Sequence, residues 1–445
     1  MDDAQKSLRY VTWVIAGTVV LLLGATIAIS VFVTRSKAPR GLGKINSIYG
    51  EEISTIPTLS SRHVSQINSA ALSSEGDPLL VPVFWNNEEG AFIIEIKLGK
   101  NWVALVVDTG SSHISAKGVD CKWKQCDGEI CQETACPCAG NRGCNGTQFE
   151  PSGPQVGIDL NGDGTVTSES TLIYGSQQSS VTHYFESFEM YQLYLGCTDM
   201  VFETEFLNSR QLFKNLNPEG LHLVKFGPTT VHLVNKIQGT STSNIFGLAR
   251  GAEAGETVLL HSVFGKRPPL WSMVTTSERS GWIAFGALRC FGDPTYVPLV
   301  LPQEFKTFAT QFYIVPVIAV YVNDRKVENN GTPRFIIADT GTTNSYGSTR
   351  FGSALGAVDW NEGISTVSFV VGDDNHICVL KYEPKDYYDP DGYYASSINV
   401  TESRTLDNFD EMFHGVNVFL MGVRLMNNIY WEYDIANNRL GIIQL

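Results

Sequence analysis

Basic residues are scarce in this chain of 445 residues. Lysine and arginine together number 32 against 46 aspartate and glutamate residues, which gives a formal net charge of −14. Proteins that bind nucleic acid neutralise phosphates with lysine and arginine, so this balance argues against a nucleic-acid partner. The zinc-protease signature H-E-x-x-H is missing too, because none of the eight histidines is followed by glutamate. We therefore expect no nucleic-acid partner and no zinc-dependent protease.

A long hydrophobic run near the N-terminus covers residues 10–33. At a rise of roughly 1.5 Å per residue, a helix of this length can cross a hydrocarbon core of about 30 Å. We expect a single transmembrane helix here that acts as a signal anchor, after a short cytoplasmic tail of residues 1–9. The alternative is a cleaved signal peptide, whose apolar region is normally only about 7 to 15 residues long.

Two kinds of sequence signal disagree about the side of the membrane on which the body lies. More lysine and arginine follow the hydrophobic run than precede it, and the positive-inside rule alone would place the body in the cytoplasm. Clustered cysteines and N-glycosylation sequons favour an oxidising compartment instead, and long domains can be translocated despite flanking charge. We expect a lumenal or extracellular body on the secretory or endolysosomal route. The candidate glycosylation sites are Asn145, Asn330 and Asn399.

Six of the nine cysteines lie close together, in an insert over residues 121–144. Their spacing lacks the paired C-x-x-C units of a zinc ribbon and no histidine is interleaved, so disulfides are favoured over zinc. Six cysteines allow many pairings, and the connectivity stays open. In the C-terminal half, Cys290 and Cys378 are able to pair, which would leave Cys197 free or joined elsewhere. The clustered candidates are Cys121, Cys126, Cys131, Cys136, Cys138 and Cys144.

The remaining chain divides by its texture. Residues 34–80 are rich in Ser, Thr, Gly and Ile without sustained periodicity, which is typical of a stem or a removable pro-segment. From Pro82 onward, short apolar runs alternate with Gly, Asn, Asp and Pro, which predicts strands and an all-β body. We expect two β units, over residues 81–290 and 291–445.

Two aspartates with matching surroundings stand out within this body. Asp108 ends the run VALVVD and Asp339 ends the run RFIIAD, and each is followed by Thr and Gly. When two carboxylates share a site they cannot both ionise easily, so the pair holds one proton over a broad pH range. The ionised member can then take a proton from an attacking water while the protonated member donates to a carbonyl oxygen. These residues are our candidate catalytic pair.

The residues that follow each aspartate have a role as supports. Glycine lets backbone N–H groups approach a carboxylate, and the hydroxyl of the residue after this glycine can donate a hydrogen bond to the carboxylate. His113, beside the first of these loops, is expected to be a local hydrogen-bonding residue. The support residues are Thr109, Gly110, Ser111, Thr340, Gly341 and Thr342.

The body also repeats itself in outline. FIIEI precedes the first Asp-Thr-Gly triplet and YIVPV precedes the second. Farther on, each half has apolar residues and a glycine at a strand end, over residues 245–248 and 420–423. This order indicates two diverged copies of one unit.

Three stretches together resemble the pepsin-like aspartic protease family: VVDTGSS, IIADTGTT and the closing FLMGVRLMNNIYWEYDIANNRLGI. The resemblance covers about residue 80 to the end. It implies a two-lobed β fold with an active-site cleft between the lobes, and an endopeptidase that acts on polypeptide as a monomer without metal or cofactor. The alternative is a pepsin-like binding protein that keeps the cleft but lacks the chemistry.

The chain departs from the family pattern at several places. Tyr174 and Gly175 match the Tyr-Gly tip of the family's flap hairpin, but two glutamines follow where a glycine is usual. Ser115 stands where the family has a tryptophan that supports the flap tyrosine. The cysteine-rich insert resembles that of nepenthesin-type members.

A short acidic stretch, Asp159 to Ser170, matches the start of an EF-hand calcium loop. The bidentate Glu of position 12 is replaced by Ser170, and no helical pattern flanks the loop. We expect a solvated polar turn, with calcium binding as the alternative.

Overall fold

The computed structural model shows a body built mainly of strands. This confirms the all-β fold class expected from the sequence. The described residues are 78–86, 89–127, 130–136, 148–159, 166–174, 177–193, 221–238, 244–250, 259–264, 269–276, 280–288, 291–300, 312–327, 334–347, 365–387, 398–399 and 417–445.

The predicted anchor, residues 10–33, and nearly all of the predicted stem lie outside these ranges. Within them, no helix has the length and apolar character needed to cross a bilayer.

The strands fall into an earlier and a later series along the chain. The earlier ones are β1 (Leu79–Asn86), β2 (Ala91–Leu98), β3 (Asn101–Asp108), β4 (Ile114–Asp127), β5 (Ile130–Ala135), β6 (Glu169–Tyr174), β7 (Gln177–Leu193), β8 (Leu221–Gln238), β9 (Ile245–Gly247), β10 (Leu270–Thr276) and β11 (Ser280–Phe285). The later ones are β12 (Thr295–Pro298), β13 (Ile314–Val322), β14 (Arg325–Lys326), β15 (Arg334–Asp339), β16 (Ser345–Gly347), β17 (Val367–Gly372), β18 (Ile377–Tyr382), β19 (Ile398–Asn399), β20 (Asn417–Gly422), β21 (Ile429–Asp434) and β22 (Arg439–Gln444). The described helices are short: α5 (Leu259–Phe264), α7 (Pro384–Tyr387) and α9 (Val423–Met426).

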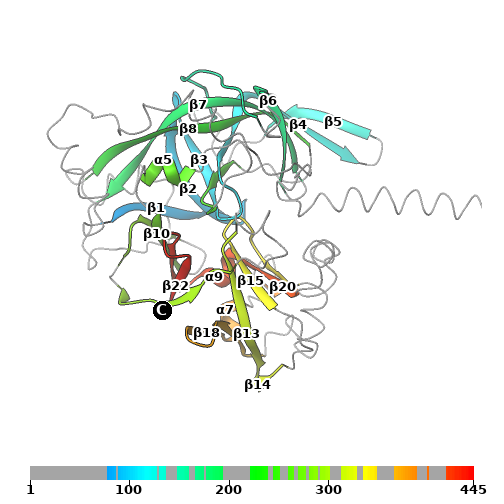
Figure 1. Cartoon of the computed structure of the whole chain (residues 1–445). Helices are drawn as coiled ribbons and strands as arrows, with labels where there is room; N and C mark the ends of the chain where they lie inside the picture. Colours follow the sequence, from blue (N-terminus) through cyan, green and yellow to red (C-terminus); the bar gives the residue numbers. More distant parts are fainter. Residues whose placement is uncertain are drawn as a thin grey trace, which may run out of the picture.

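These strands pair into two sheets within the described part of the chain. The larger has the order β12-β22-β21-β10-β11-β1-β2-β3-β9-β4-β8-β7-β6, with β5 on β4. The smaller has the order β18-β17-β13-β15-β20-β16-β19, with β14 on β13. In Figure 1 the blue and green strands β2 to β8 form the upper part of the molecule, and the yellow and orange strands β13 to β20 form the lower part.

One pairing order occurs twice, and it contains both aspartate-bearing strands. In the order β2-β3-β9-β4, β3 runs parallel to β9 and β9 antiparallel to β4. In the order β13-β15-β20-β16, β15 runs parallel to β20 and β20 antiparallel to β16. The register matches as well, because Asp108 lies opposite Gly247 and Asp339 lies opposite Gly422. The internal repeat expected from the sequence is therefore present in the topology.

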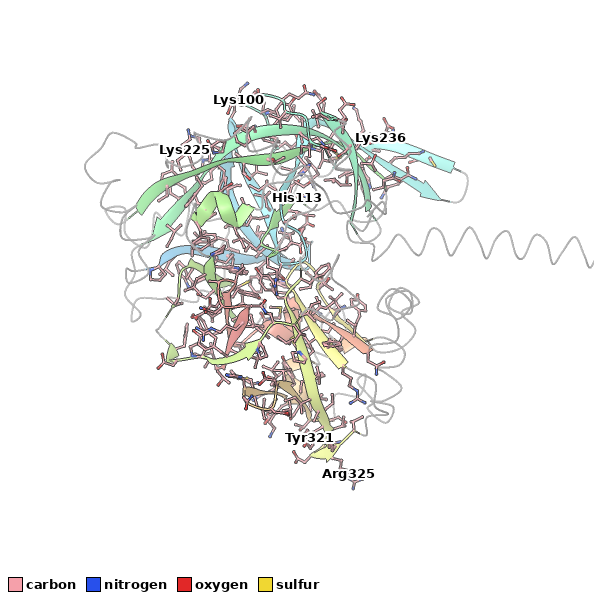
Figure 2. The ribbon with its side chains drawn as sticks, in the orientation of Figure 1. Lys100, His113, Lys225, Lys236, Tyr321 and Arg325 are labelled. Carbon is pink, nitrogen blue, oxygen red and sulfur yellow. A yellow bond between two sulfur atoms is a disulfide. The ribbon has the colours of Figure 1, made fainter. Side chains whose placement is uncertain are left out.

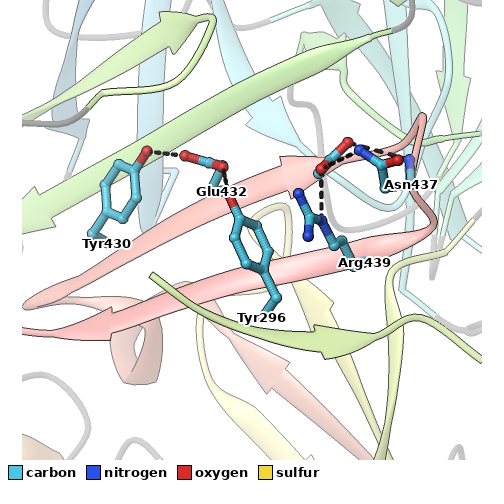
Figure 3. A network of polar contacts seen from close by, with 6 residues as sticks. Tyr296, Tyr430, Glu432, Asn437 and Arg439 are labelled. Carbon is cyan, nitrogen blue, oxygen red and sulfur yellow. Dashed lines mark hydrogen bonds and ion pairs between the residues drawn. The ribbon is translucent and has the colours of Figure 1, made fainter. Parts of the chain in front are cut away.

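The last strands of the chain return to the larger sheet. β21 pairs with β10, so one sheet joins residues from both sides of the expected boundary at residue 290. Every residue of β21 is buried, including Glu432. Its carboxylate accepts hydrogen bonds from the hydroxyls of Tyr296 and Tyr430, the latter at 2.6 Å, as Figure 3 shows. A carboxylate paired in this way can be buried without a large desolvation cost.

Most apolar positions of the strands belong to one large core cluster, and smaller clusters lie around Trp282 and around Cys121. Ile94, Ile96 and Leu98 of β2 are fully buried, with polar residues between them. This alternation buries one face of a strand, and each such side chain contributes roughly 1.5–3 kcal/mol. Asn244 connects β3 to β4, since its amide donates to the Ala104 carbonyl and its side-chain oxygen accepts from the Lys117 N–H.

The cysteine-rich insert begins with the β4–β5 hairpin, and it contains disulfides as the sequence predicts. Cys121 and Cys136 are bonded to each other, and Cys131 is also disulfide-bonded. Cys126 lies directly across from Cys131 in the strand register. The candidates Cys138, Cys144, Cys197 and Cys290 lie outside the described residues.

The structure corrects one disulfide candidate, because Cys378 carries a free thiol. Its side chain is partly buried on β18 and packs against the apolar core, where burial raises the pKa of the thiol. The pairing with Cys290 that the sequence suggested is therefore wrong for this thiol. Among the glycosylation candidates, Asn399 lies in β19, while Asn145 and Asn330 lie outside the described residues.

Candidate active site

Two strand ends bring the predicted catalytic aspartates to one place. Asp108 is the last residue of β3 and Asp339 the last of β15. A Cβ atom added to Gly110 would lie 3.0 Å from Asp108 Oδ1 and 3.2 Å from Asp339 Oδ1, and one added to Gly341 would overlap the Asp108 carboxylate. Both glycines therefore stand where only a residue without a side chain fits between the two acids. Asp108 and Asp339 are far apart in the sequence, and the fold brings them together here.

Each carboxylate receives the same pair of hydrogen bonds from its own loop. The Gly110 N–H donates to Asp108 Oδ1 at 2.7 Å, and the Ser111 hydroxyl donates to Asp108 Oδ2. The Gly341 N–H donates to Asp339 Oδ1 at 2.9 Å, and the Thr342 hydroxyl donates to Asp339 Oδ2 at 2.6 Å. These contacts match those expected of the support residues, while the catalytic role of the pair stays a prediction.

Two threonines tie the loops together in a crossed arrangement. The Thr109 N–H donates to the Thr340 hydroxyl at 3.0 Å, and the Thr340 N–H donates to the Thr109 hydroxyl at 2.9 Å. Each hydroxyl in turn donates to a carbonyl of the opposite strand, Thr109 to Ala338 at 2.9 Å and Thr340 to Val107 at 2.7 Å. Both side chains are fully buried. The relative position of the two aspartates is thus fixed by hydrogen bonds that cross between the halves.

The two carboxyl groups differ in their surroundings. Asp339 is buried, whereas Asp108 is partly exposed. Burial, and then the charge of Asp108, raise the pKa of Asp339 to about 7, although hydrogen bonds from Thr342 and Gly341 oppose the rise. The raised pKa favours the protonated form of Asp339, so this member of the pair is suited to donate a proton.

An aromatic cluster near the ends of β3 and β15 was not predicted from the sequence. Tyr313 donates its hydroxyl to the Leu248 carbonyl at 2.7 Å, and the Leu248 N–H donates to the Asp108 carbonyl at 2.7 Å. Tyr433 stacks on Trp271 with ring centroids 3.9 Å apart. Burial first, then the charges of Tyr313 and Asp339, raise the pKa of Tyr433. The signal in the sequence was the aromatic content of β21 (IYWEYD), whereas Trp271 is the single aromatic residue of β10 and Tyr313 directly precedes β13.

Gly247 and Gly422, which pair with Asp108 and Asp339 in the sheets, lie against the backbone of the loops that follow these aspartates. A Cβ atom on Gly247 would lie 2.5 Å from the His113 N atom and 2.5 Å from the Ser111 carbonyl oxygen. On Gly422 it would lie 2.8 Å from the Thr342 carbonyl oxygen. No side chain fits at either position, which explains why the sequence repeat keeps a glycine there.

The predicted flap residues lie on a hairpin. β6 and β7 pair up to Tyr174 and Gln177, with a two-residue connection that includes Gly175. Gly175 and the side chain of Tyr174 are outside the described part of the structure. Ser115, which stands in place of the family's tryptophan, is buried in β4. The role of the hairpin as a flap stays a prediction.

His113 is buried inside the first half, where it belongs to a cluster of three imidazole rings. Its ring centroid lies 4.4 Å from that of His232, and His232 Nδ1 lies 2.9 Å from His183 Nδ1. Figure 2 shows His113 in the interior of the upper part of the molecule. The sequence does not reveal this cluster, because His183 and His232 are far from His113 along the chain.

The predicted calcium-like turn is closed by backbone pairing at its base. The Ile158 N–H donates to the Thr167 carbonyl at 2.8 Å, and the Thr167 N–H donates back at 3.0 Å. The residues between Asp159 and Val166 lie outside the described ranges. Within those ranges, no group of three or more His, Cys, Asp or Glu side chains is placed to hold a metal ion.

No model of a known protein family and no curated protein matches this chain. The function is therefore argued from the geometry around Asp108 and Asp339.

Proposed function

We propose that this protein is an aspartic endopeptidase with a two-lobed, pepsin-like fold. One observation carries the proposal: two equivalent strand ends contribute one carboxylate each, with matched N–H and hydroxyl donors on both. Crossed threonines hold the two loops together. Two adjacent carboxylates repel each other when both are ionised, so this pair costs stability, and perturbed groups of this kind cluster at functional sites.

The proposed mechanism assigns a different role to each acid. Asp108, the more exposed member, is ionised and takes a proton from a water molecule as that water attacks the scissile carbonyl. Asp339, whose raised pKa of about 7 keeps it protonated in acidic solution, donates its proton to the carbonyl oxygen. In the collapse of the tetrahedral intermediate, Asp108 donates the proton it took from the water to the amide nitrogen and the C–N bond breaks. Asp339 takes back the proton from the intermediate's hydroxyl as the carbonyl of the new carboxyl group forms, which restores the starting state of the pair. Neither a covalent enzyme intermediate nor a metal is required.

In this proposal the two lobes comprise residues 81–290 and 291–445. A polypeptide substrate lies in the cleft between them, under a flap at Tyr174 and Gly175. Residues 10–33 anchor the protein in a membrane, with the body on the lumenal or extracellular side. The β4–β5 disulfides support that location, because disulfides persist in oxidising compartments.

Cleavage of a peptide library by the full-length chain in detergent tests this proposal. We expect the wild type to cleave between about pH 3 and 7, and Asp108→Asn and Asp339→Asn each to lose on the order of a thousandfold in kcat or more, since each removes one of the two proton-transfer groups. Asp374→Asn, at an exposed position on the surface, is the matched control and should retain full activity. No cleavage by the wild type, or equal cleavage by the dyad variants, would contradict the proposal and favour a binding protein.

A further inference from the structure

The turn between β1 and β2 reaches the second catalytic loop from the opposite half of the chain. Gly90 in this turn has φ +61°, and a Cβ atom there would lie 2.7 Å from Thr343 Oγ1 and 3.0 Å from Thr343 Cγ2. The turn is closed by its own hydrogen bonds, from the Gly90 N–H to the Asn86 carbonyl at 2.8 Å and from the Glu89 N–H to Asn86 Oδ1 at 3.2 Å. The Gly90 backbone is therefore held against the Thr343 side chain.

A second contact joins the same two regions. The Arg424 guanidinium lies over the ring of Trp85 in β1, 5.9 Å from its centroid. Trp85 is itself braced by Phe92 of β2, with ring centroids 5.3 Å apart. The backbone N–H of Arg424 donates to the Thr343 carbonyl at 3.3 Å. Thr343 is thus contacted on its side chain by the β1–β2 turn, and its backbone is bonded to a residue that the same hairpin holds.

Thr343 is the direct neighbour of a residue that bonds a catalytic carboxylate. The Thr342 hydroxyl donates to Asp339 Oδ2 at 2.6 Å, and the Thr342 carbonyl accepts from the Val423 N–H at 2.8 Å. A displacement of Thr343 therefore moves the hydroxyl that stabilises ionised Asp339. Misplacement of catalytic groups by about 1 Å can reduce the rate by about a hundredfold.

We propose that the β1–β2 turn, through Gly90 and Trp85, is a positioning element for the second catalytic loop. The turn belongs to the first half and acts on the acid of the second half, so it sets the position of Asp339 in addition to the threonine cross-bonds. Glycine is required at residue 90 for two reasons, its positive φ and the lack of space in front of Thr343. This inference rests on the proposed function for its kinetic consequences, but not for its structural ones.

A size-compensation experiment in the full-length protein tests the inference. Gly90→Ala should push Thr343 aside and lower kcat about tenfold, with KM changed less than about twofold, because the chemical step needs the loop geometry more than binding does. Thr343→Ala removes Oγ1 and Cγ2 and leaves Thr343 Cβ 3.4 Å from the added methyl, an ordinary contact. The double variant should therefore regain most of the lost kcat.

Gly292→Ala is the matched control for backbone strain. Gly292 also has a positive φ, +98°, but nothing lies within 4 Å of an added Cβ. This variant should keep wild-type kcat and KM. Arg424→Met serves as a second variant without any backbone strain, and it should lower kcat in the same way as Gly90→Ala by releasing the loop from Trp85.

Titration of Asp339 separates this inference from the proposed function. A longer Thr342–Asp339 hydrogen bond favours the protonated acid, so NMR of labelled aspartate carboxyls should show a higher pKa of Asp339 in Gly90→Ala and Arg424→Met, with recovery in the Gly90→Ala/Thr343→Ala double variant. If the wild type cleaves nothing, the proposed function fails while this readout still decides the inference. Unchanged kcat and unchanged Asp339 titration in both single variants, or a double variant no better than Gly90→Ala, would overturn it.

Discussion

Asp108 and Asp339 have the same neighbours in sequence but not the same exposure. Each accepts hydrogen bonds from the N–H of the glycine two residues later and from the hydroxyl of the residue that follows this glycine. Only Asp339 is buried, and its pKa is raised to about 7. The asymmetry comes from packing around the second loop, and it decides which acid holds the shared proton.

This asymmetry predicts the alkaline limit of activity. The proposed mechanism needs Asp339 protonated, so kcat should fall as pH rises through about 7, where Asp339 ionises. Thr342→Val removes a hydrogen bond that stabilises the ionised form and should move this limit to higher pH. Measurement of kcat from pH 4 to 9 on wild type and variant checks both statements. A limit that moves downward in the variant would contradict the assignment of the proton.

Removal of the hydroxyl should affect the free energy of unfolding differently at two buried tyrosines near the dyad, Tyr313 and Tyr433. Tyr313 donates to the Leu248 carbonyl and accepts from the Trp271 indole N–H at 3.2 Å, so Tyr313→Phe should lower the free energy of unfolding by about 1–3 kcal/mol. The Tyr433 hydroxyl has no hydrogen-bond partner in the part of the chain that the structure describes. Tyr433→Phe should therefore be neutral or slightly stabilising in urea unfolding. A loss in Tyr433→Phe as large as that in Tyr313→Phe would show that the hydroxyl is paired in solution.

At the scale of single elements, β21 shows how polar groups are accommodated in a fully buried strand. Glu432 is satisfied by two tyrosine hydroxyls, one on β21 itself and one on β12. Asp434, at the end of the strand, accepts from Arg439 Nε at 2.7 Å and from Asn437 Nδ2 at 2.8 Å, as Figure 3 shows. These contacts join β12, β21 and β22 into one edge of the larger sheet.

The network around Glu432 predicts a specific stability effect. Glu432→Met keeps the length of the side chain but leaves the buried phenol of Tyr430 and the half-buried phenol of Tyr296 without this acceptor, which should cost about 2–4 kcal/mol. The triple variant that also carries Tyr296→Phe and Tyr430→Phe removes both stranded donors and should recover part of the loss. Urea unfolding of the three proteins measures the difference. A triple variant less stable than Glu432→Met would contradict this account.

At the scale of the whole molecule, two diverged copies of one strand order meet at the crossed threonines. Each threonine hydroxyl both accepts from an N–H and donates to a carbonyl across the seam. The chain separation between the two residues is 231, so these bonds form only once both halves are folded. The same hydrogen bonds therefore stabilise the contact between the halves and fix the positions of Asp108 and Asp339.

Threonine-to-valine changes should reveal this coupling. Thr109→Val keeps the shape of the side chain but leaves a buried N–H and a buried carbonyl unsatisfied, at a cost of about 2–4 kcal/mol. Thr340→Val should cost a similar amount, and the double variant less than the sum, because the two hydroxyls also contact each other at 3.5 Å and belong to one network. Thr→Ser at either position keeps the hydroxyl and is the matched control. Strictly additive losses in urea unfolding would indicate that the two threonines act independently.

Much of this protein was determined by local sequence pattern. The short β-branched and aromatic runs predict strands, and the two Asp-Thr-Gly triplets predict matched loops, because a carboxylate beside glycine can be bonded by the backbone that follows it. The repeat around Gly247 and Gly422 was also predicted, because each glycine follows apolar residues in its half of the sequence. Both positions exclude any side chain, which accounts for the glycines. These features depend on residues close together in the chain.

Only the tertiary structure decided which residues meet across long separations. The return of β21 and β22 to the larger sheet, the threonine cross-bonds, the three-histidine cluster and the contact of Gly90 with Thr343 all join distant segments. The free thiol of Cys378 and the burial of Asp339 belong to the same class, because both follow from how the sheets pack. A local pattern gives the chemistry of each residue, whereas proximity and burial arise when the whole chain folds.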